Sequence, residues 1–302
     1  MADESSTDPM IAFLMENPPK DALEFRAILD GFALQLNANM PDIGESLDDV
    51  VIAEFEKQNL TVDIHKPKGE GPFPILIYFH GGGWIMGSPK THRKLCFRFA
   101  EAGYLVFNVH YRLAPEYPFP AAFDDCLTAL SWVQENAQQY DGDASRIAVG
   151  GDSAGGNLTA AVAASLSDAG NSPIKSILLI YPALDFANMD SEQGAIPGSD
   201  SNLVDMMVDS YIGHDYNKLV VDPRVSPIHV AEKLPEAHVM CGTADALIED
   251  CQKLMGKLEA AGIPAESAFF DEMPHGFAQM EDFFPQAKES IERMIAFLNR
   301  TV

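Results

Sequence analysis

The sequence predicts an α/β fold, in which helices cover both faces of a mostly parallel β-sheet. From about residue 50 onward, strand-like and helix-like segments alternate along the chain, and this order is typical of a parallel sheet with helical crossovers. Two of the strand candidates, 75–79 and 177–180, are continuous apolar runs. Such runs indicate strands that are buried on both faces rather than on one.

Eight segments have the length and composition of strands. They are 50–56, 60–65, 74–80, 104–111, 146–150, 176–181, 237–242 and 266–271. The first two are joined by residues 57–59 alone, which favours an antiparallel hairpin because a parallel crossover needs a dozen or more residues. We therefore expect an eight-stranded sheet that is mixed at one edge and parallel beyond it.

Helices are predicted between these strands and are expected to flank the sheet. The amphipathic stretches lie at about 91–102, 121–139, 156–168, 246–261 and 285–299. Gly103 and Gly262 follow two of them, at the position where a glycine commonly ends a helix.

Two segments, residues 1–48 and 186–220, interrupt the alternation. The first contains helical pieces joined by proline-containing turns, and the second has a Gly/Ser/Asp loop followed by a short helical run at 203–212. One hypothesis is that both form a helical cap over the carboxyl-terminal edge of the sheet, which leaves 49–185 and 221–302 as the α/β domain. The alternative is that they are ordinary excursions that only pack against the sheet.

Acidic residues dominate the charged composition. The 45 Asp and Glu residues against 20 Lys and Arg residues give a formal net charge of −25 and a pI of about 4.4. This charge would repel a phosphate backbone or an anionic membrane surface, so we expect neither nucleic-acid binding nor membrane binding. Hydrophobic residues make up 47% of the chain, which is enough for one large core and too much for a disordered chain.

The sequence also predicts a cytoplasmic protein without a metal site. Its four cysteines, Cys96, Cys126, Cys241 and Cys251, lack the close spacing of a zinc or redox pair, so reduced, buried thiols are expected. Residues 1–5 lack the basic and apolar regions of a signal peptide. No apolar run is long enough to span a bilayer.

A G-x-S-x-G motif is the strongest chemical signal in the chain. Residues 151–155 (GDSAG) follow the strand predicted at 146–150 and precede a helix expected to start near Gly156. In such a strand-to-helix turn the serine hydroxyl is exposed at the sheet edge, and the flanking glycines avoid steric clashes. The alternatives are an incidental serine in a glycine-rich turn, or a phosphate-binding turn that lacks the lysine of a P-loop.

A second motif, 80–84 (HGGGW), ends the third predicted strand. Its glycines expose backbone N–H groups, and such donors stabilise the oxyanion of a tetrahedral intermediate together with the N–H of the residue after the nucleophile. His80 and Gly81 are predicted to support this loop. A flexible loop without a chemical role is the alternative.

A serine nucleophile needs a base and an acid that orients the base. His275 follows the last predicted strand and is the candidate base. The other histidines are interpreted as structural residues or as residues at the protein surface. Asp245 lies in the turn after the strand at 237–242 and is the candidate acid. Glu249 and Asp250, on the helix that follows, are interpreted as solvating charges and remain the alternatives.

Four motifs in this order resemble those of the hormone-sensitive-lipase-like (bacterial family IV) esterases, which have the α/β-hydrolase fold. The motifs are 80–84 (HGGGW), 111–116 (YRLAPE), 151–157 (GDSAGGN) and 222–227 (DPRVSP). The resemblance covers roughly residues 45–302 and implies Ser153 as the nucleophile, His275 as the base and Asp245 as the acid. It also implies a homodimer that pairs through the edge of the last strand, which an exposed strand edge allows.

The resemblance further implies an oxyanion hole formed by the backbone N–H groups of Gly82, Gly83 and Ala154. Which two glycines of the loop donate stays open at this point. The implied reaction is the hydrolysis of a carboxylic ester through an acyl-enzyme, and it needs neither a metal nor an organic cofactor.

Short- to medium-chain, neutral esters are the expected substrates, since the net charge disfavours anionic ones. Bulky side chains are predicted to line the substrate pocket: Trp84, Tyr181, Phe186, Met206, Met207 and Tyr211. The same side chains are equally suited to docking the cap onto the sheet. The alternative functions are a non-catalytic ligand-binding protein with this fold, which the presence of His275 disfavours, and an amidase with the same triad.

Overall fold

The structure of the protein is a computed structural model that describes residues 19–167, 172–189 and 202–302. Residues 1–18 and 190–201 of the predicted cap lie outside the described residues, and so does the N-terminal stretch that argues against a signal peptide. No helix in the described ranges is long and apolar enough to cross a membrane.

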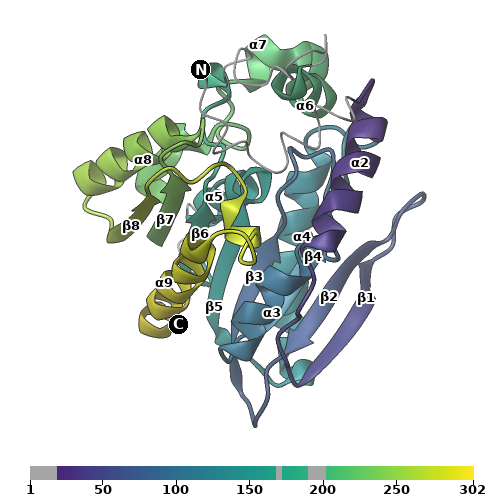
Figure 1. The fold of residues 1–302 in the computed structure, drawn as a ribbon, viewed down its shortest axis with the longest axis vertical. Coiled ribbons are helices and arrows are strands. Elements are labelled where there is room, and N and C mark those ends of the chain that lie inside the picture. The colour runs from purple at the N-terminus through teal and green to yellow at the C-terminus, as the bar shows by residue number, and fades with distance from the viewer. Residues whose placement is uncertain (1–18, 168–171, 190–201) are drawn as a thin grey trace.

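The described residues form one eight-stranded sheet with the order β1-β2-β4-β3-β5-β6-β7-β8 (Figure 1). β1 pairs with β2, and β2 with β4, in antiparallel fashion, and all other neighbours are parallel. The predicted eight-stranded sheet, mixed at one edge and parallel beyond it, is therefore confirmed. The strands are β1 (Glu45–Ala53), β2 (Leu60–Lys66), β3 (Phe73–Phe79), β4 (Leu105–His110), β5 (Gly142–Asp152), β6 (Ile174–Ile180), β7 (Glu236–Gly242) and β8 (Ala265–Phe270).

The first strand differs most from its prediction, because β1 begins at Glu45 and not at residue 50. Its N-terminal half is largely exposed and polar, so it carries no apolar run. Backbone pairing with β2, in which Glu45 lies opposite Lys66, extends the strand instead. The predicted domain boundary between residues 48 and 49 thus falls within β1.

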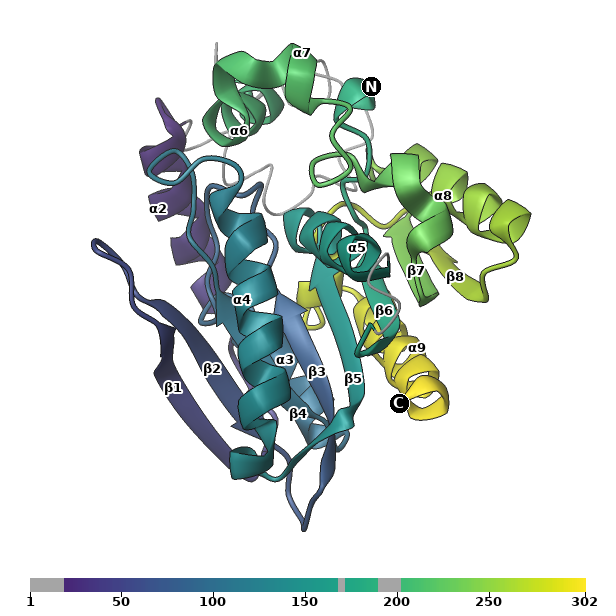
Figure 2. The same cartoon turned by 180° about the vertical axis from the view of Figure 1, so that it is seen from behind.

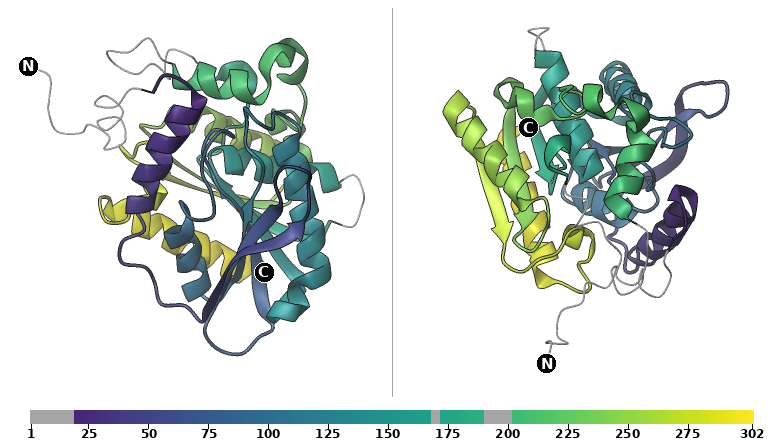
Figure 3. Two further views of the ribbon diagram at one scale, coloured as in Figure 1. Left: turned by 90° about the vertical axis from the view of Figure 1, so that its right-hand side faces the viewer. Right: turned by 90° about the horizontal axis from the view of Figure 1, so that it is seen from above.

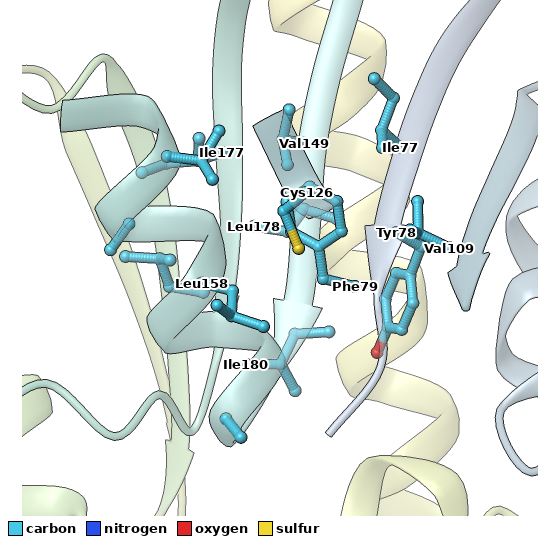
Figure 4. Close-up of a cluster of buried hydrophobic side chains, with 14 of the residues drawn as sticks. Ile77, Tyr78, Phe79, Val109, Cys126, Val149, Leu158, Ile177, Leu178 and Ile180 are labelled. Carbon is cyan, nitrogen blue, oxygen red and sulfur yellow. The ribbon is translucent and has the colours of Figure 1, made fainter. Parts of the chain in front are cut away.

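Five helices cover the two faces of the sheet. α3 (Arg93–Glu101) and α9 (Pro285–Thr301) lie on one face, and α4 (Ala121–Asn136), α5 (Ala154–Ser167) and α8 (Ile248–Ala261) lie on the other (Figures 1 and 2). Ile77, Val149 and Ile177 lie opposite one another on adjacent strands and are fully buried, as are Leu158 of α5 and Cys126 of α4 (Figure 4). The four cysteines are free and buried, as predicted.

Three further helices stand away from the sheet at one end of the molecule: α2 (Ala22–Gln35), α6 (Leu203–Tyr211) and the short α7 (Tyr216–Leu219) (Figures 1 and 3). α2 contacts α6, and two of its polar residues fasten it to the loops after β4 and β3. The Arg26 guanidinium donates to the Glu116 carboxylate at 2.7 Å and to the Ala114 carbonyl at 2.7 Å. Asp30 accepts the N–H of Gly87 at 2.9 Å.

Candidate active site

Ser153 occupies a sharp turn between β5 and α5. Its φ of +53° is unusual for a residue with a side chain, and its N–H donates to the carbonyl of Ile180 at 2.8 Å. A Cβ at Gly155 would clash with the carbonyl oxygen of Phe79, and one at Gly151 would clash with the carbonyl of Gly155. Both glycines are therefore required by the close approach of backbone. α5 begins directly at the residue after the serine, two residues earlier than predicted.

The structure brings Ser153, His275 and Asp245 together in one hydrogen-bonded row. His275 Nε2 lies 3.0 Å from Ser153 Oγ, and His275 Nδ1 lies 2.8 Å from Asp245 Oδ2. The Asp245 side chain is buried, and its other oxygen accepts the N–H of Leu247 at 2.9 Å. The three residues come from the loops that follow β5, β8 and β7, which end at the same edge of the parallel sheet.

The two alternative acids lie elsewhere. Asp250 is buried and accepts the N–H groups of Leu184 at 3.3 Å and Asp185 at 3.0 Å, so it supports the loop after β6. Glu249 is exposed on α8. Neither carboxylate forms a described hydrogen bond with His275.

The glycine loop after β3 presents backbone N–H groups beside Ser153. Gly82 and Gly83 have φ values of +124° and +56°, which glycine adopts readily. The N–H of Gly81 is already bound to Asp152 Oδ1 at 2.9 Å. Within the described ranges, no acceptor is found for the N–H groups of Gly82, Gly83 and Ala154.

His80 lies beneath this loop and is fully buried. Its ring stacks on Tyr111 with 4.2 Å between ring centroids, and its Nδ1 lies 2.9 Å from the Gly81 carbonyl oxygen. Burial holds the pKa of His80 well below its usual value, so the ring is neutral at neutral pH. These contacts support the glycine loop, which is the role predicted for His80.

An apolar cavity of about 300 Å³ lies above Ser153 and His275. Three of the predicted pocket residues, Trp84, Tyr181 and Met207, line it. The Met207 thioether fills the space that a Cβ at Gly83 would need, so it covers the glycine loop closely. The cap supplies much of the remaining wall: Phe25, Leu29, Phe32 and Ala33 from α2, Leu36 directly after α2, and Leu203 and Val204 from α6.

Three residues predicted for the pocket are placed elsewhere. Tyr211 is fully buried and stacks on Trp84 with 4.7 Å between ring centroids, and Phe186 packs against the same indole at 4.9 Å. Both rings therefore back the pocket wall without lining the cavity. Met206 is partly buried against the core and is not among the residues that line the cavity.

The sequence suggested that the segment containing α2 is part of a cap, but no residue of α2 was predicted to line the pocket. The apolar residues of α2 recur at helical spacing, which predicts a buried face but not the surface that this face covers. Gln279, which also lines the cavity, lies in the loop of His275 four residues downstream. That proximity along the chain is the signal that could have singled it out.

The fold and this geometry define the class of the protein. A serine on a strand-to-helix turn, hydrogen-bonded to a histidine that in turn contacts a buried aspartate, is the arrangement of a serine hydrolase on an α/β sheet. The order of the three residues along the chain is serine, aspartate, histidine, as in α/β-hydrolases.

Comparisons with known proteins agree with this class. The sequence profile of the alpha/beta hydrolase fold matches residues 76–279. Carboxylesterase NlhH of Mycobacterium tuberculosis is 36% identical over 237 residues, which cover 76% of this chain and 74% of that protein. Ethyl acetate hydrolase of Pseudomonas putida is 30% identical over 275 residues, covering 88% and 86%.

Among solved structures, an esterase from the bacterial hormone-sensitive lipase family superposes with a TM-score of 0.81 at 28% identity, over 98% of this chain and 99% of that chain. The chain therefore belongs to the α/β-hydrolase family, among its hormone-sensitive-lipase-like esterases. It is a carboxylic ester hydrolase, as the motifs predicted.

Proposed function

We propose that Ser153 is the nucleophile of an acyl-enzyme mechanism, with His275 as general base and Asp245 as the residue that orients it. The observation that carries this assignment is the pair of hydrogen bonds on the two nitrogens of His275, to Ser153 Oγ at 3.0 Å and to Asp245 Oδ2 at 2.8 Å. His275 takes the proton of Ser153 as Oγ attacks the ester carbonyl, and then delivers it to the leaving alcohol. Water, activated by the same imidazole, hydrolyses the acyl-enzyme.

The oxyanion of each tetrahedral intermediate is held by the N–H groups of Gly82, Gly83 and Ala154. Gly81 is left out of this set because its N–H is bound to Asp152. Each oxyanion donor in such a site contributes roughly 3 kcal/mol of transition-state stabilisation. The first turn of α5 follows Ser153 directly, so the positive end of the α5 helix dipole also stabilises the negative charge of the oxyanion.

The substrates proposed here are short- to medium-chain neutral esters. A cavity of about 300 Å³ lies at the small end of the range for ligand sites, which begins near 300 Å³. Its walls are largely apolar, and the net charge of −25 repels anionic esters. One relative is named for hydrolysing ethyl acetate, a short neutral ester.

The cap that limits chain length lies within residues 1–48 and 186–220, of which 45–48 belong to β1 of the sheet, and 49–185 and 221–302 form the catalytic domain. The support is that α2 and α6, one from each cap segment, line the cavity above Ser153. A variant that lacks the cap residues of α2 should accept longer esters than the full chain, which a rate profile over ester chain length measures.

We further propose that two copies pair through the free edge of β8 and that the protein works in the cytoplasm. β8 is the outermost strand, and Phe269 on it is 36% exposed. The free state of the four cysteines suits a reducing compartment. Sedimentation at the 32.9 kDa mass of one chain would refute the dimer, and recovery outside the cytoplasm on cell fractionation would refute the location.

The experiment that tests the mechanism is labelling with a fluorophosphonate, followed by mass mapping of the modified residue. We expect the label on Ser153, and none after Ser153→Ala or His275→Ala. Asp245→Asn should lower kcat by about 10⁴-fold, the loss typical of a triad aspartate. Glu249→Gln, an exposed acid on the next helix, is the matched control and should leave kcat unchanged. Full activity of Asp245→Asn would refute the assignment of the acid.

A further inference from the structure

The carboxylate of Asp152, the residue before Ser153, is fully buried and joins several loops of the site. Its Oδ1 accepts the Tyr78 hydroxyl at 2.8 Å and the N–H of Gly81 at 2.9 Å. Its Oδ2 accepts the side-chain amide of Gln279 at 3.2 Å and lies 3.2 Å from His92 Nε2. Asp152 thus fastens the glycine loop to the serine turn on one side and meets the loop of His275 on the other.

The hydrogen bonds around His92 indicate which of its nitrogens carries the proton. Thr91 Oγ1 donates to the Ser88 carbonyl at 2.9 Å, so towards His92 Nδ1, 2.8 Å away, it acts as the acceptor. On this basis we assign the ring proton to Nδ1, which leaves Nε2 as an acceptor. His92 Nε2 lies 2.9 Å from the amide nitrogen of Gln279 and 3.3 Å from the backbone nitrogen of Gly81.

The side-chain amide of Gln279 has two protons and finds two acceptors, Asp152 Oδ2 and His92 Nε2. Gln279 ends the short turn η6 (Phe277–Gln279), which follows His275 in the same loop. No other described hydrogen bond links this loop to Asp152 or His92. Beside the hydrogen bond between His275 and Ser153, the amide is therefore a second polar link between the loop that carries the base and the unit formed by the serine turn and the glycine loop.

Asp152 is suited to this role because two other donors, the Tyr78 hydroxyl at 2.8 Å and the Gly81 N–H at 2.9 Å, already fix its buried carboxylate. A carboxylate that is already the acceptor of several donors resists displacement, since a buried charge left without partners is costly.

We propose that Gln279 is a positioning residue, which holds His275 in line with Ser153 and the oxyanion-hole glycines by bridging Asp152 and His92. This inference rests on the proposed function of the triad. Because a displacement of about 1 Å in a catalytic group costs up to about 100-fold in rate, loss of the bridge lowers kcat. It leaves KM nearly unchanged, since the apolar walls that bind the substrate are retained.

Gln279→Glu is the decisive variant because it nearly preserves the size of the side chain and replaces both donors by a carboxylate facing Asp152. At pH 8 its kcat should fall by about 10- to 100-fold, with KM within about twofold of the wild type. At lower pH the new carboxyl takes up a proton and donates it to Asp152 or His92, so the ratio of variant to wild-type kcat should rise as the pH falls. Titrations shared by both enzymes cancel in this ratio.

Two further variants complete the experiment. Gln279→Met, of similar size and without donors, should show the same loss of kcat at every pH. Gln252→Glu adds the same charge on the exposed face of α8 and should match the wild type throughout. Thermal melting by circular dichroism establishes whether each variant is folded. If Gln279→Glu does not fold, Gln279→Met tests the inference, which requires a lower kcat at a nearly unchanged KM.

A wild-type kcat in both Gln279 variants, or a ratio for Gln279→Glu that does not change with pH, overturns the inference. Fluorophosphonate labelling separates this failure from that of the proposed function. If the wild type is labelled at Ser153 and the Gln279 variants react at the same rate, only the positioning role is wrong. If the wild type is not labelled at Ser153, the triad assignment is wrong.

Discussion

Met207 is expected to set the upper limit of substrate chain length. Its thioether covers Gly83 so closely that it occupies the space of the missing Cβ, and it forms part of the cavity wall. A substrate chain that runs towards α6 ends against this side chain. Met207→Ala removes Cγ, Sδ and Cε, and this space lies directly beside the glycine loop.

The size of the effect follows from the room that the substitution opens. The three lost atoms leave space for two or three methylene groups, each of which contributes about 0.8 kcal/mol when it is buried. Transition-state binding of esters longer than the present limit should therefore improve by about 2 kcal/mol, or roughly 30-fold in kcat/KM. Acetyl esters do not reach this space, so their kcat/KM should change little.

The assay is kcat/KM over a series of p-nitrophenyl esters of increasing acyl length, measured for the wild type, Met207→Ala and Met206→Ala. Met206 is the matched control, because it is the same residue type on the same helix and does not line the cavity. The reasoning is refuted if the chain-length optimum of Met207→Ala stays where it is in the wild type, or if Met206→Ala shifts it equally.

Two predictions concern stability. Gly155→Ala should lower the free energy of unfolding in urea by about 3 kcal/mol, because its Cβ meets backbone, whereas Gly256→Ala on α8, with open space around it, should raise this free energy by up to about 1 kcal/mol. Equal effects would contradict the steric argument. Burial lowers the pKa of His65 from 6.5 to about 3, so between these values the unfolded chain binds a proton that the folded protein excludes. The contribution of His65 to the free energy of unfolding is therefore fully present above pH 6.5, and about 2 kcal/mol of it is lost between pH 7 and pH 5. His65→Gln should remove this part of the pH dependence of the unfolding free energy. An unchanged pH dependence in the variant would contradict the prediction.

The elements that the sequence predicted well have signals confined to short stretches of chain. The strands β3 and β6 contain continuous apolar runs, and they appear within one or two residues of their predicted bounds. Ser153, Asp245 and His275 lie in the loops that follow β5, β7 and β8, and the parallel sheet brings these loops to one edge. β1 carries no such signal in its polar N-terminal half, and its start was predicted too late.

The catalytic chemistry and the sheet were thus readable from the chain, because hydrophobic periodicity and glycine-dependent turns are local properties. The pocket wall and the support of the site were not. α2 meets the cavity where Arg26 fastens it to the loop after β4 and Asp30 fastens it to the loop after β3. Asp152 meets Gln279 across 127 residues of sequence. Such contacts depend on how distant loops pack in space, and no periodic pattern in a single sequence records that distance.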